Sequence, residues 1–208
     1  MKQDIVITIS REFGSGGRKL GKHLAQRLEI PFYDKKALTS FIEKDGINKL
    51  SVKNIKDHIN GAQYYLDIPL KNYVGQGGRI GFIALQERIY RRQKEMIKSL
   101  SKESCVIVGR CSQAILEDHP KVIRIFVRAD KADKVQTIRR LYNLDEKAAL
   151  TKMKDVNEKR ANYFEYFTNQ QWKSMNHYDL VVNTSKLSED EIIMMMIELL
   201  GQREKTSR

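Results

Sequence analysis

The chain has 208 residues, is 41% hydrophobic and carries 38 basic against 26 acidic residues, a net charge of +12 at pH 7. This length and hydrophobic content allow one sizeable core, so we expect a single domain over residues 1–208. No segment approaches the roughly 20 apolar residues of a membrane-spanning helix, and the first residues lack the pattern of a signal peptide. We therefore expect a cytoplasmic protein without a membrane partner. The positive charge indicates a polyanionic partner, but does not distinguish phosphorylated small molecules from nucleic acid.

Five short apolar runs indicate the strands of a parallel sheet. They lie at residues 5–9, 31–33, 105–108, 122–127 and 180–182. Most are rich in β-branched residues and continuous rather than alternating, which is typical of strands covered on both faces. Helical patterns separate the runs. The predicted fold class is therefore α/β, a doubly wound five-stranded parallel sheet with right-handed helical crossovers.

Two long segments interrupt this alternation of strand and helix. We predict helical insertions at 45–104, where glycines weaken the early part of the pattern, and at 129–177, which is charged and helical. The last helix has the clearest boundaries. Ser188 and Glu191 form the sequence pattern of a capping box at its start, and Gly201 predicts its end.

A glycine-rich turn follows the first predicted strand and precedes an amphipathic helix. The turn and the two basic residues after it are Gly14, Ser15, Gly16, Gly17, Arg18 and Lys19. Glycines in this setting let backbone N–H groups face an anion at the positive end of the helix dipole. We therefore predict that these six residues bind phosphate. A tight strand-to-helix turn without a ligand is the alternative interpretation.

The turn departs from the standard P-loop sequence G-x-x-x-x-G-K-[ST] at two positions. Arg18 follows the last glycine in place of lysine, and Lys19 stands in place of the hydroxyl residue that holds magnesium. Arginine also neutralises phosphate, so Arg18 is a candidate catalytic residue. Magnesium needs another oxygen. Ser10, Ser15 and a water-mediated contact from Asp34 are candidates, and we assign no metal ligand.

Several segments of the chain together resemble a known family. They are residues 9–18, 30–34, 106–110, 159–167 and 178–185. Their sequences resemble the cytidylate kinase-like family, a divergent branch of the nucleoside monophosphate kinases, over most of the chain outside residues 45–80. The resemblance implies a P-loop kinase-type sheet with ATP and Mg²⁺ over the glycine turn. It further implies an acceptor-binding insertion at 45–104, an arginine-bearing lid at 129–177, and adenine next to Thr184 and Ser185.

The acceptor-binding motifs of that family are only partly retained. In true cytidylate kinases a Gly-Arg-Asp sequence after the third strand holds the acceptor monophosphate, whereas here Gly109 and Arg110 precede Cys111. The family's Leu-Asp-Ser/Thr-Gly sequence, which meets the acceptor nucleoside, appears only as residues 33–36, with lysine in place of the hydroxyl residue. Asp34 either orients the acceptor or a magnesium-bound water, or caps the following helix. The acceptor is therefore left open, with CMP as the simplest candidate.

Arginines are the main candidates for phosphate binding beyond the turn. Arg110 follows a buried strand, at the edge where open α/β sheets bind ligands. Arg160, in the implied lid, is the candidate that stabilises the transferring phosphoryl group, with Asp155 as its orienting partner. The resemblance places the basic helix around residue 90 beside the acceptor. We therefore expect Arg88 or Arg92 to turn toward the acceptor phosphate.

Two further groups of residues are assigned no catalytic role. The cysteines, Cys105 and Cys111, lack the spacing of a metal site or a disulfide framework, so we expect reduced thiols. An aromatic group comprises Tyr163, Phe164, Tyr166, Phe167 and Trp172. The spacing of these residues indicates packing of a helix onto the body of the protein more than stacking on nucleic-acid bases.

The predicted function is an ATP-dependent phosphotransferase, most simply a nucleoside monophosphate kinase with nucleotides as its partners. Catalysis would come from in-line positioning and from stabilisation of charge in a closed site. Two alternatives remain. One is a regulator that binds nucleotide without turnover, in keeping with the atypical P-loop, and the other is a basic RNA-binding domain. The oligomeric state is left open.

Overall fold

The structure, a computed structural model, describes residues 5–38 and 78–206. Five parallel strands form one sheet in the order β2-β3-β1-β4-β5. They are β1 (Val6–Arg11), β2 (Phe32–Tyr33), β3 (Cys105–Val108), β4 (Val122–Arg128) and β5 (Leu180–Asn183). All five predicted strands are confirmed, and three of them extend one or two residues past their predicted ends. The first part of the predicted insertion at 45–104 lies outside the described residues, which resume at 78.

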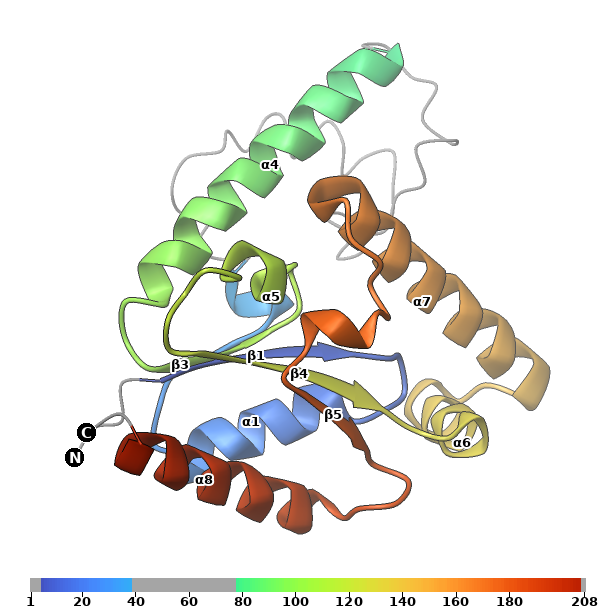
Figure 1. The fold of residues 1–208 in the computed structure, drawn as a ribbon. Coiled ribbons are helices and arrows are strands. Elements are labelled where there is room, and N and C mark those ends of the chain that lie inside the picture. Colours follow the sequence, from blue (N-terminus) through green and yellow to red (C-terminus); the bar gives the residue numbers. More distant parts are fainter. Residues whose placement is uncertain (1–4, 39–77, 207–208) are drawn as a thin grey trace.

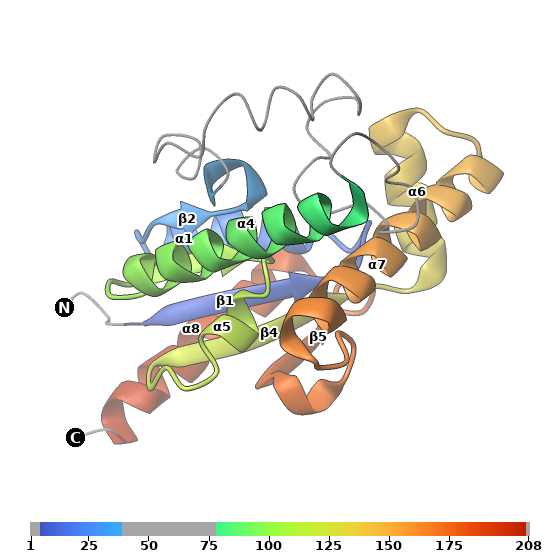
Figure 2. The ribbon, with the colours of Figure 1, turned by 90° about the horizontal axis from the view of Figure 1, so that it is seen from above.

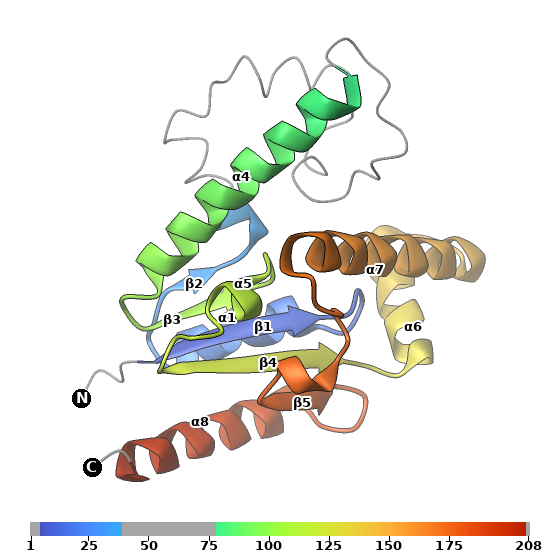
Figure 3. The ribbon, with the colours of Figure 1, turned by 45° about the horizontal axis from the view of Figure 1, so that its top comes forward.

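Helices cover both faces of the sheet, which confirms the doubly wound arrangement. Figure 1 shows two helices on one side, α1 (Gly17–Arg27) and α8 (Glu189–Thr206). It shows three on the other side, α4 (Gly78–Leu100), α5 (Ser112–Ile115) and α7 (Glu146–Thr168), and Figure 2 looks onto this second face. In Figure 3, α6 (Lys131–Tyr142) lies against α7 beyond β4. Residues 129–177 thus contribute α6, α7 and a short 3-10 turn, Met175–His177. None of the described helices has both the length and the apolar character needed to cross a membrane.

The sheet separates two apolar cores. On one side Ile7 of β1 packs in a buried cluster with Leu24 of α1 and Ile192 of α8. On the other side Val6 belongs to a second buried cluster, which includes Ile97 of α4. Successive residues of β1 therefore face opposite cores, and this explains why its apolar run is continuous rather than alternating.

The aromatic residues around α7 pack into the body, as their spacing predicted. Phe164 is 3% exposed and Trp172 is 5% exposed. The ring of Phe167 stacks on that of Tyr90 from α4, with 4.2 Å between the centroids. Tyr166 differs, since half of it is exposed. Because stacking on bases needs open ring faces, this burial favours the packing interpretation over RNA binding.

The central position of β1 brings the ends of several strands together. β1 pairs with β3 as far as Val108 and with β4 as far as Val127. Since parallel strands end at the same edge, Arg11 and the glycine turn after β1 lie beside Gly109 and Arg110, which follow β3. Ligands of open α/β sheets bind outside this carboxyl edge.

The last helix begins as predicted but ends later. The backbone N–H of Ser188 donates to Glu191 Oε2 at 2.7 Å, and the N–H of Glu191 donates to Ser188 Oγ at 3.3 Å, which confirms the capping box. The prediction that Gly201 ends the helix is wrong, because α8 continues to Thr206. A glycine that ends a helix adopts a positive φ, whereas Gly201 keeps a negative one.

Replacement of Gly201 by alanine is expected to stabilise the protein. A methyl group at this position would meet no other atom within 4 Å. Gly201→Ala should raise the free energy of unfolding by about 0.5–1 kcal/mol, because alanine has less backbone freedom to lose on folding. Thermal denaturation followed by circular dichroism measures the change. A lower melting temperature would contradict a regular helix at this position.

Candidate functional site

The glycine turn has the backbone geometry of an anion-binding helix start. Gly14 and Gly16 have φ values of 87° and 76°, which side chains rarely tolerate, and Gly16 is the N-cap of α1. The N–H groups of the first helical turn have no acceptor within a helix, and the positive end of the helix dipole lies there. The turn can therefore hold an anion through its main chain.

Ser15 closes the turn from inside. Its hydroxyl lies 2.9 Å from the backbone oxygen of Glu12 and 3.1 Å from that of Val127, and the residue is 2% exposed. The hydroxyl of Thr184 in turn donates to the backbone oxygen of Ser15 at 3.0 Å. The side chain of Ser15 thus shapes the loop, and it does not point outward as a magnesium ligand would.

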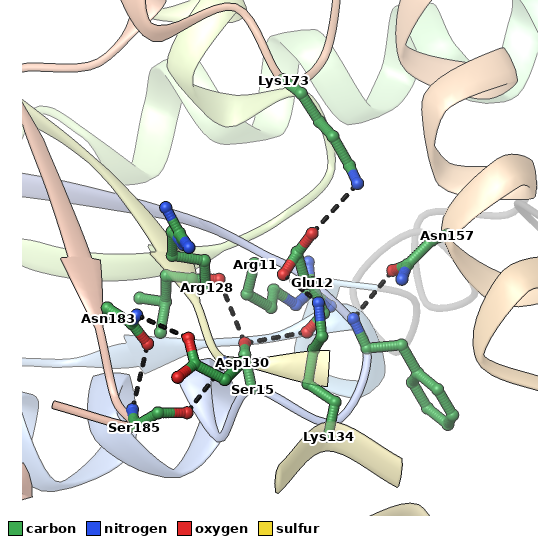
Figure 4. A network of polar contacts seen from close by, with 12 residues as sticks. Arg11, Glu12, Ser15, Arg128, Asp130, Lys134, Asn157, Lys173, Asn183 and Ser185 are labelled. Carbon is green, nitrogen blue, oxygen red and sulfur yellow. Dashed lines mark hydrogen bonds and ion pairs between the residues drawn. The ribbon is translucent and has the colours of Figure 1, made fainter. Parts of the chain in front are cut away.

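Glu12 ties the turn to the segment between β4 and β5. Figure 4 shows its carboxylate between Lys134 of α6, at 2.5 Å, and Lys173, at 3.0 Å. The backbone N–H of Phe13 donates to Asn157 Oδ1 of α7 at 2.8 Å. Burial alone would raise the pKa of Glu12, but the two lysines hold it below its usual range. The turn and the helices that cover it are therefore joined by charged contacts.

Arg18 lies beside Asp34 at the end of β2. Its Nε and Nη2 atoms are 2.7 Å and 2.6 Å from Asp34 Oδ2, although the Arg18 side chain is 64% exposed. The other oxygen of Asp34 accepts the backbone N–H of Ala37 at 3.1 Å, so Asp34 caps the following helical turn. Burial would raise the pKa of Asp34, but the bonds from Ala37 and Arg18 hold it below its usual range.

This lowered pKa has a consequence at acid pH. The charged form of Asp34 stabilises the fold above the unfolded pKa of about 4, and the contribution is lost as pH falls through the lower pKa of the folded state. Asp34→Asn keeps the cap but not the charge. We therefore expect the free energy of unfolding of this variant to fall less steeply than that of wild type as the pH is lowered. Asp34→Ala should lower the free energy of unfolding by about 1 kcal/mol more than Asp34→Asn does, because it also removes the cap. Urea denaturation at a series of acid pH values measures both, and an unchanged pH dependence in Asp34→Asn would contradict the assignment.

Arg110 enters the site from a strained connection after β3. Three successive residues, Gly109, Arg110 and Cys111, have φ values of 77°, 62° and 57°. Such conformations cost a side-chain-bearing residue about 1–3 kcal/mol and cluster at functional sites. Arg110 is 6% exposed, and its Nη1 and Nη2 atoms lie 3.4 Å from Gln93 Oε1 and 3.5 Å from the backbone oxygen of Lys35. The Gln93 amide also donates to the backbone oxygen of Arg110 at 2.9 Å, so Gln93 fixes its position.

Arg160 reaches the site from α7, but not with the partner expected from the sequence. Its Nη1 donates to the backbone oxygen of Arg11 at 2.9 Å, and its guanidinium lies over the ring of Phe13 at 5.5 Å. Asp155 instead accepts from Lys159, one helical turn further along α7, at 2.8 Å. Asp155 therefore forms an ion pair along its own helix, and the expectation that it orients Arg160 is not met.

Three other predicted ligands point away from this site. Arg88 and Arg92 are exposed on α4, where Arg92 pairs with Glu95 at 3.0 Å. Gln93, on the inner side of the same helix, is fully buried and contacts Arg110. Lys19 pairs with Glu189 at the start of α8, at 2.7 Å. The expectation that Arg88 or Arg92 turns inward is thus not met, because the apolar face of α4 sets which side faces the sheet.

A pocket opens beside the turn, at the ends of β1 and β3 and under α7. Among its lining residues are Ser10, Arg11, Arg110, Cys111, Arg160 and Trp172. Arg11 was missed in the sequence analysis, although it stands at the end of a strand just as Arg110 does. The pocket concentrates positive charge next to a main-chain anion site. It is therefore suited to a ligand that bears phosphate.

Magnesium fits this site less well than phosphate does. The hydroxyl of Ser15 faces backbone oxygens, and the carboxylates of Glu12 and Asp34 already have cationic partners. No group of three or more His, Cys, Asp and Glu side chains in the described part of the chain could hold a metal ion. Backbone N–H groups and arginine side chains are the groups at this site that suit a phosphate ligand.

Both cysteines are free and buried in the structure. Burial raises the thiol pKa of Cys105 to about 12. It does the same at Cys111, where the nearby charge of Arg110 opposes the effect without cancelling it. Since the thiolate is the reactive form, neither residue is a nucleophile near neutral pH.

Comparisons with known proteins agree with this geometry. The sequence pattern of the cytidylate kinase-like family matches residues 6–186. No curated protein matches the chain. An uncharacterized protein from Eubacterium ventriosum ATCC 27560 has a similar structure, with a TM-score of 0.69, 29% identity, and coverage of 95% of this chain and 98% of that one.

Two more distant structures show the fold alone. TT1252 from Thermus thermophilus has a TM-score of 0.55 at 14% identity, over 94% of this chain and 96% of its own. Shikimate kinase from Bacteroides thetaiotaomicron has a TM-score of 0.50 at 16% identity, over 95% and 98%. The five-stranded parallel sheet is that of P-loop kinases. The chain belongs to the cytidylate kinase-like family.

Proposed function

We propose that this protein is an ATP-dependent phosphotransferase, most simply a nucleoside monophosphate kinase that transfers the γ-phosphoryl group of ATP to CMP or another small acceptor. The observation that carries the proposal is the arginine-lined pocket directly beside the glycine turn. A main-chain anion site and a cationic pocket at one sheet edge suit two phosphate-bearing ligands side by side.

Each part of the site has a role in this proposal. The backbone of residues 14–19 would hold the donor phosphates, and Arg18 would neutralise them after leaving Asp34. Arg110 would hold the acceptor phosphate, and Arg160 would meet the charge of the transferring group. Such a reaction needs little covalent help from the protein, since positioning and charge stabilisation provide most of the catalysis.

The two insertions complete the proposal at the level of the fold. Residues 45–104 would contain the acceptor-binding part, and residues 129–177 would act as the lid. The contacts of Glu12 with Lys134 and Lys173 support a lid that rests on the turn. Adenine would lie near Thr184 and Ser185, because the hydroxyl of Thr184 already contacts the turn.

An acceptor screen tests the proposed activity. Purified protein with ATP, magnesium salt and a panel of CMP, dCMP, UMP, AMP, GMP and small alcohols should form ADP only when its acceptor is present. ATP binding by calorimetry runs in parallel as the control for an intact donor site. Binding of ATP without acceptor-dependent ADP formation would contradict the proposed kinase activity.

That contrary result would support a second candidate, a regulator that binds nucleotide without turnover. The observation in its favour is the pairing of Arg18 with Asp34, together with the presence of Arg18 and Lys19 where a standard P-loop has lysine and a hydroxyl residue. Such a protein keeps the main-chain anion site and loses the groups that position the terminal phosphate. The RNA-binding alternative has no similar support, since the aromatic residues it requires are mostly packed inside.

A further inference from the structure

Arg11 passes through a space that two glycines leave open. It is the last residue of β1, and only Glu12 and Phe13 separate it from the first glycine of the turn. A Cβ atom at Gly17 would lie 2.6 Å from Arg11 Cβ and 3.2 Å from its Cγ. A Cβ atom at Gly109 would overlap Arg11 Nη1 and lie 3.0 Å from its Cζ. The two glycines thus flank the arginine side chain from base to tip and direct its guanidinium into the pocket.

Among the described residues, the charges that act on Arg11 are mostly positive: those of Arg160, Arg110 and Arg18 against that of Asp34. Its guanidinium shares the pocket with Arg110 and Arg160. Arg18, by comparison, has the carboxylate of Asp34 at 2.6 Å, whereas no carboxylate of the described residues forms an ion pair with Arg11. Burial lowers the pKa of Arg11, the charges of Arg160 and Arg110 lower it further, and the charge of Asp34 opposes them in part. A buried cation with more cations than anions around it is stabilised by a further anion.

We propose that Arg11 binds phosphate, and that it supplies from the end of β1 the positive charge that the P-loop lysine supplies in standard kinases. Its guanidinium holds a phosphoryl group between the glycine turn and Arg110. The planar fork of arginine suits this role because it can donate two parallel hydrogen bonds to phosphate oxygens. The inference rests on the proposed function for the identity of the ligands, though not for the presence of phosphate.

The position of Arg11 admits two sources of that phosphate. The turn on one side of Arg11 suits the terminal phosphate of a nucleoside triphosphate. The pocket on the other side, with Arg110, suits a nucleoside monophosphate. Both present the same phosphoryl oxygens, so the test must contain both ligands.

Calorimetric binding to four proteins separates these sources: wild type, Arg11→Met, Arg11→Lys and the control Arg27→Ala. Arg27 is an exposed arginine at the far end of α1. The ligands are ATP, CMP and pyrophosphate, with adenosine and cytidine as the phosphate-free counterparts. We expect Arg11→Met to lower the affinity for at least one phosphate ligand about tenfold or more, with no change in affinity for the nucleosides. Arg11→Lys should lose less, and Arg27→Ala should match wild type.

The outcomes identify the ligand or overturn the inference. A loss confined to ATP supports the donor phosphate, a loss confined to CMP supports the acceptor phosphate, and a loss of both supports a bridging position. Unchanged affinity for every phosphate ligand overturns the role of Arg11. If wild type binds pyrophosphate but no nucleotide, the proposed function fails and the pyrophosphate series still tests Arg11. If wild type binds no phosphate at all, both fail.

Stability distinguishes a ligand-binding arginine from a structural one. In phosphate-free buffer, Arg11→Met should melt at a higher temperature than wild type, because it removes one of several neighbouring positive charges. Added pyrophosphate should then stabilise wild type more than the variant. A lower melting temperature with unchanged pyrophosphate affinity would make Arg11 structural and overturn the inference. Arg11→Gln, which also removes the charge, provides the same comparison if the methionine variant does not fold.

Discussion

Arg110→Ala is expected to lower the acceptor-dependent kcat/KM about 10²–10³-fold, the usual loss when one preorganised donor to a reacting group is removed. Arg110 is buried and lines the pocket from a strained connection, so its guanidinium is held in place before a ligand arrives. The dissociation constant of ATP should change little, because the proposed function assigns the donor phosphates to the glycine turn and not to Arg110. Steady-state ADP formation and calorimetric ATP binding measure the two effects.

Two variants on α4 serve as matched controls for Arg110→Ala. Gln93→Leu removes the side chain that contacts both the guanidinium and the backbone oxygen of Arg110, so its loss of activity should be smaller but measurable. Arg91→Ala removes an exposed charge from the same helix and should leave activity unchanged. Full activity of Arg110→Ala with the preferred acceptor would show that Arg110 does not bind it.

Gly14→Ala is expected to destabilise the protein strongly and to disturb the contact between the turn and α6. The φ value of 87° disfavours any side chain, and a Cβ atom would lie 2.8 Å from the backbone oxygen of Lys134 and 3.1 Å from Ile138 Cδ1. Strain and overpacking together should lower the free energy of unfolding by about 2–5 kcal/mol. Chemical denaturation measures this change, and Glu12 and Lys134 should lose their ion pair at the same time.

Gly16→Ala is the matched control, since it tests backbone strain without crowding. Gly16 has a similar φ of 76°, but a Cβ atom there would meet nothing within 4 Å. Gly16→Ala should therefore lower the free energy of unfolding by only about 1–2 kcal/mol. Equal losses of stability for the two variants would mean that contact with α6 adds nothing, which would contradict the tight fit between the turn and this helix.

The parts of the fold that could be predicted from sequence are those set by local pattern. The run 105–108 is continuous and apolar because β3 is buried on both faces, and the strand ends where the run ends. The capping box at Ser188 and Glu191 is likewise a local device. The predicted helix end at Gly201 is wrong because a glycine near the end of a helix permits a left-handed cap without requiring one.

Side-chain partners in the site could not be predicted, because they depend on distant contacts. The carboxylate of Asp155 could point along its own helix or toward the glycine turn. Its pairing with Lys159 depends on how α7 packs, which the sequence does not show. The basic helix α4 has arginines on several sides, so the sequence did not show that Gln93 is the residue facing Arg110. The position of Arg11 in the pocket could not be predicted, because the path of its side chain depends on Gly109, which is remote in the sequence.

The position of β1 in the centre of the sheet also bears on how the protein folds. The backbone N–H of Ile5 bonds to the hydroxyl of Ser104, 99 residues away, and the hydroxyl of Thr8 reaches the backbone oxygen of Ile123, 115 residues away. Contacts of such long range close large loops and form slowly. During synthesis β1 therefore has no strand to pair with until more than half of the chain has been made. The glycine turn, although encoded near the start, takes its final shape only after Lys134 and Lys173 have been made.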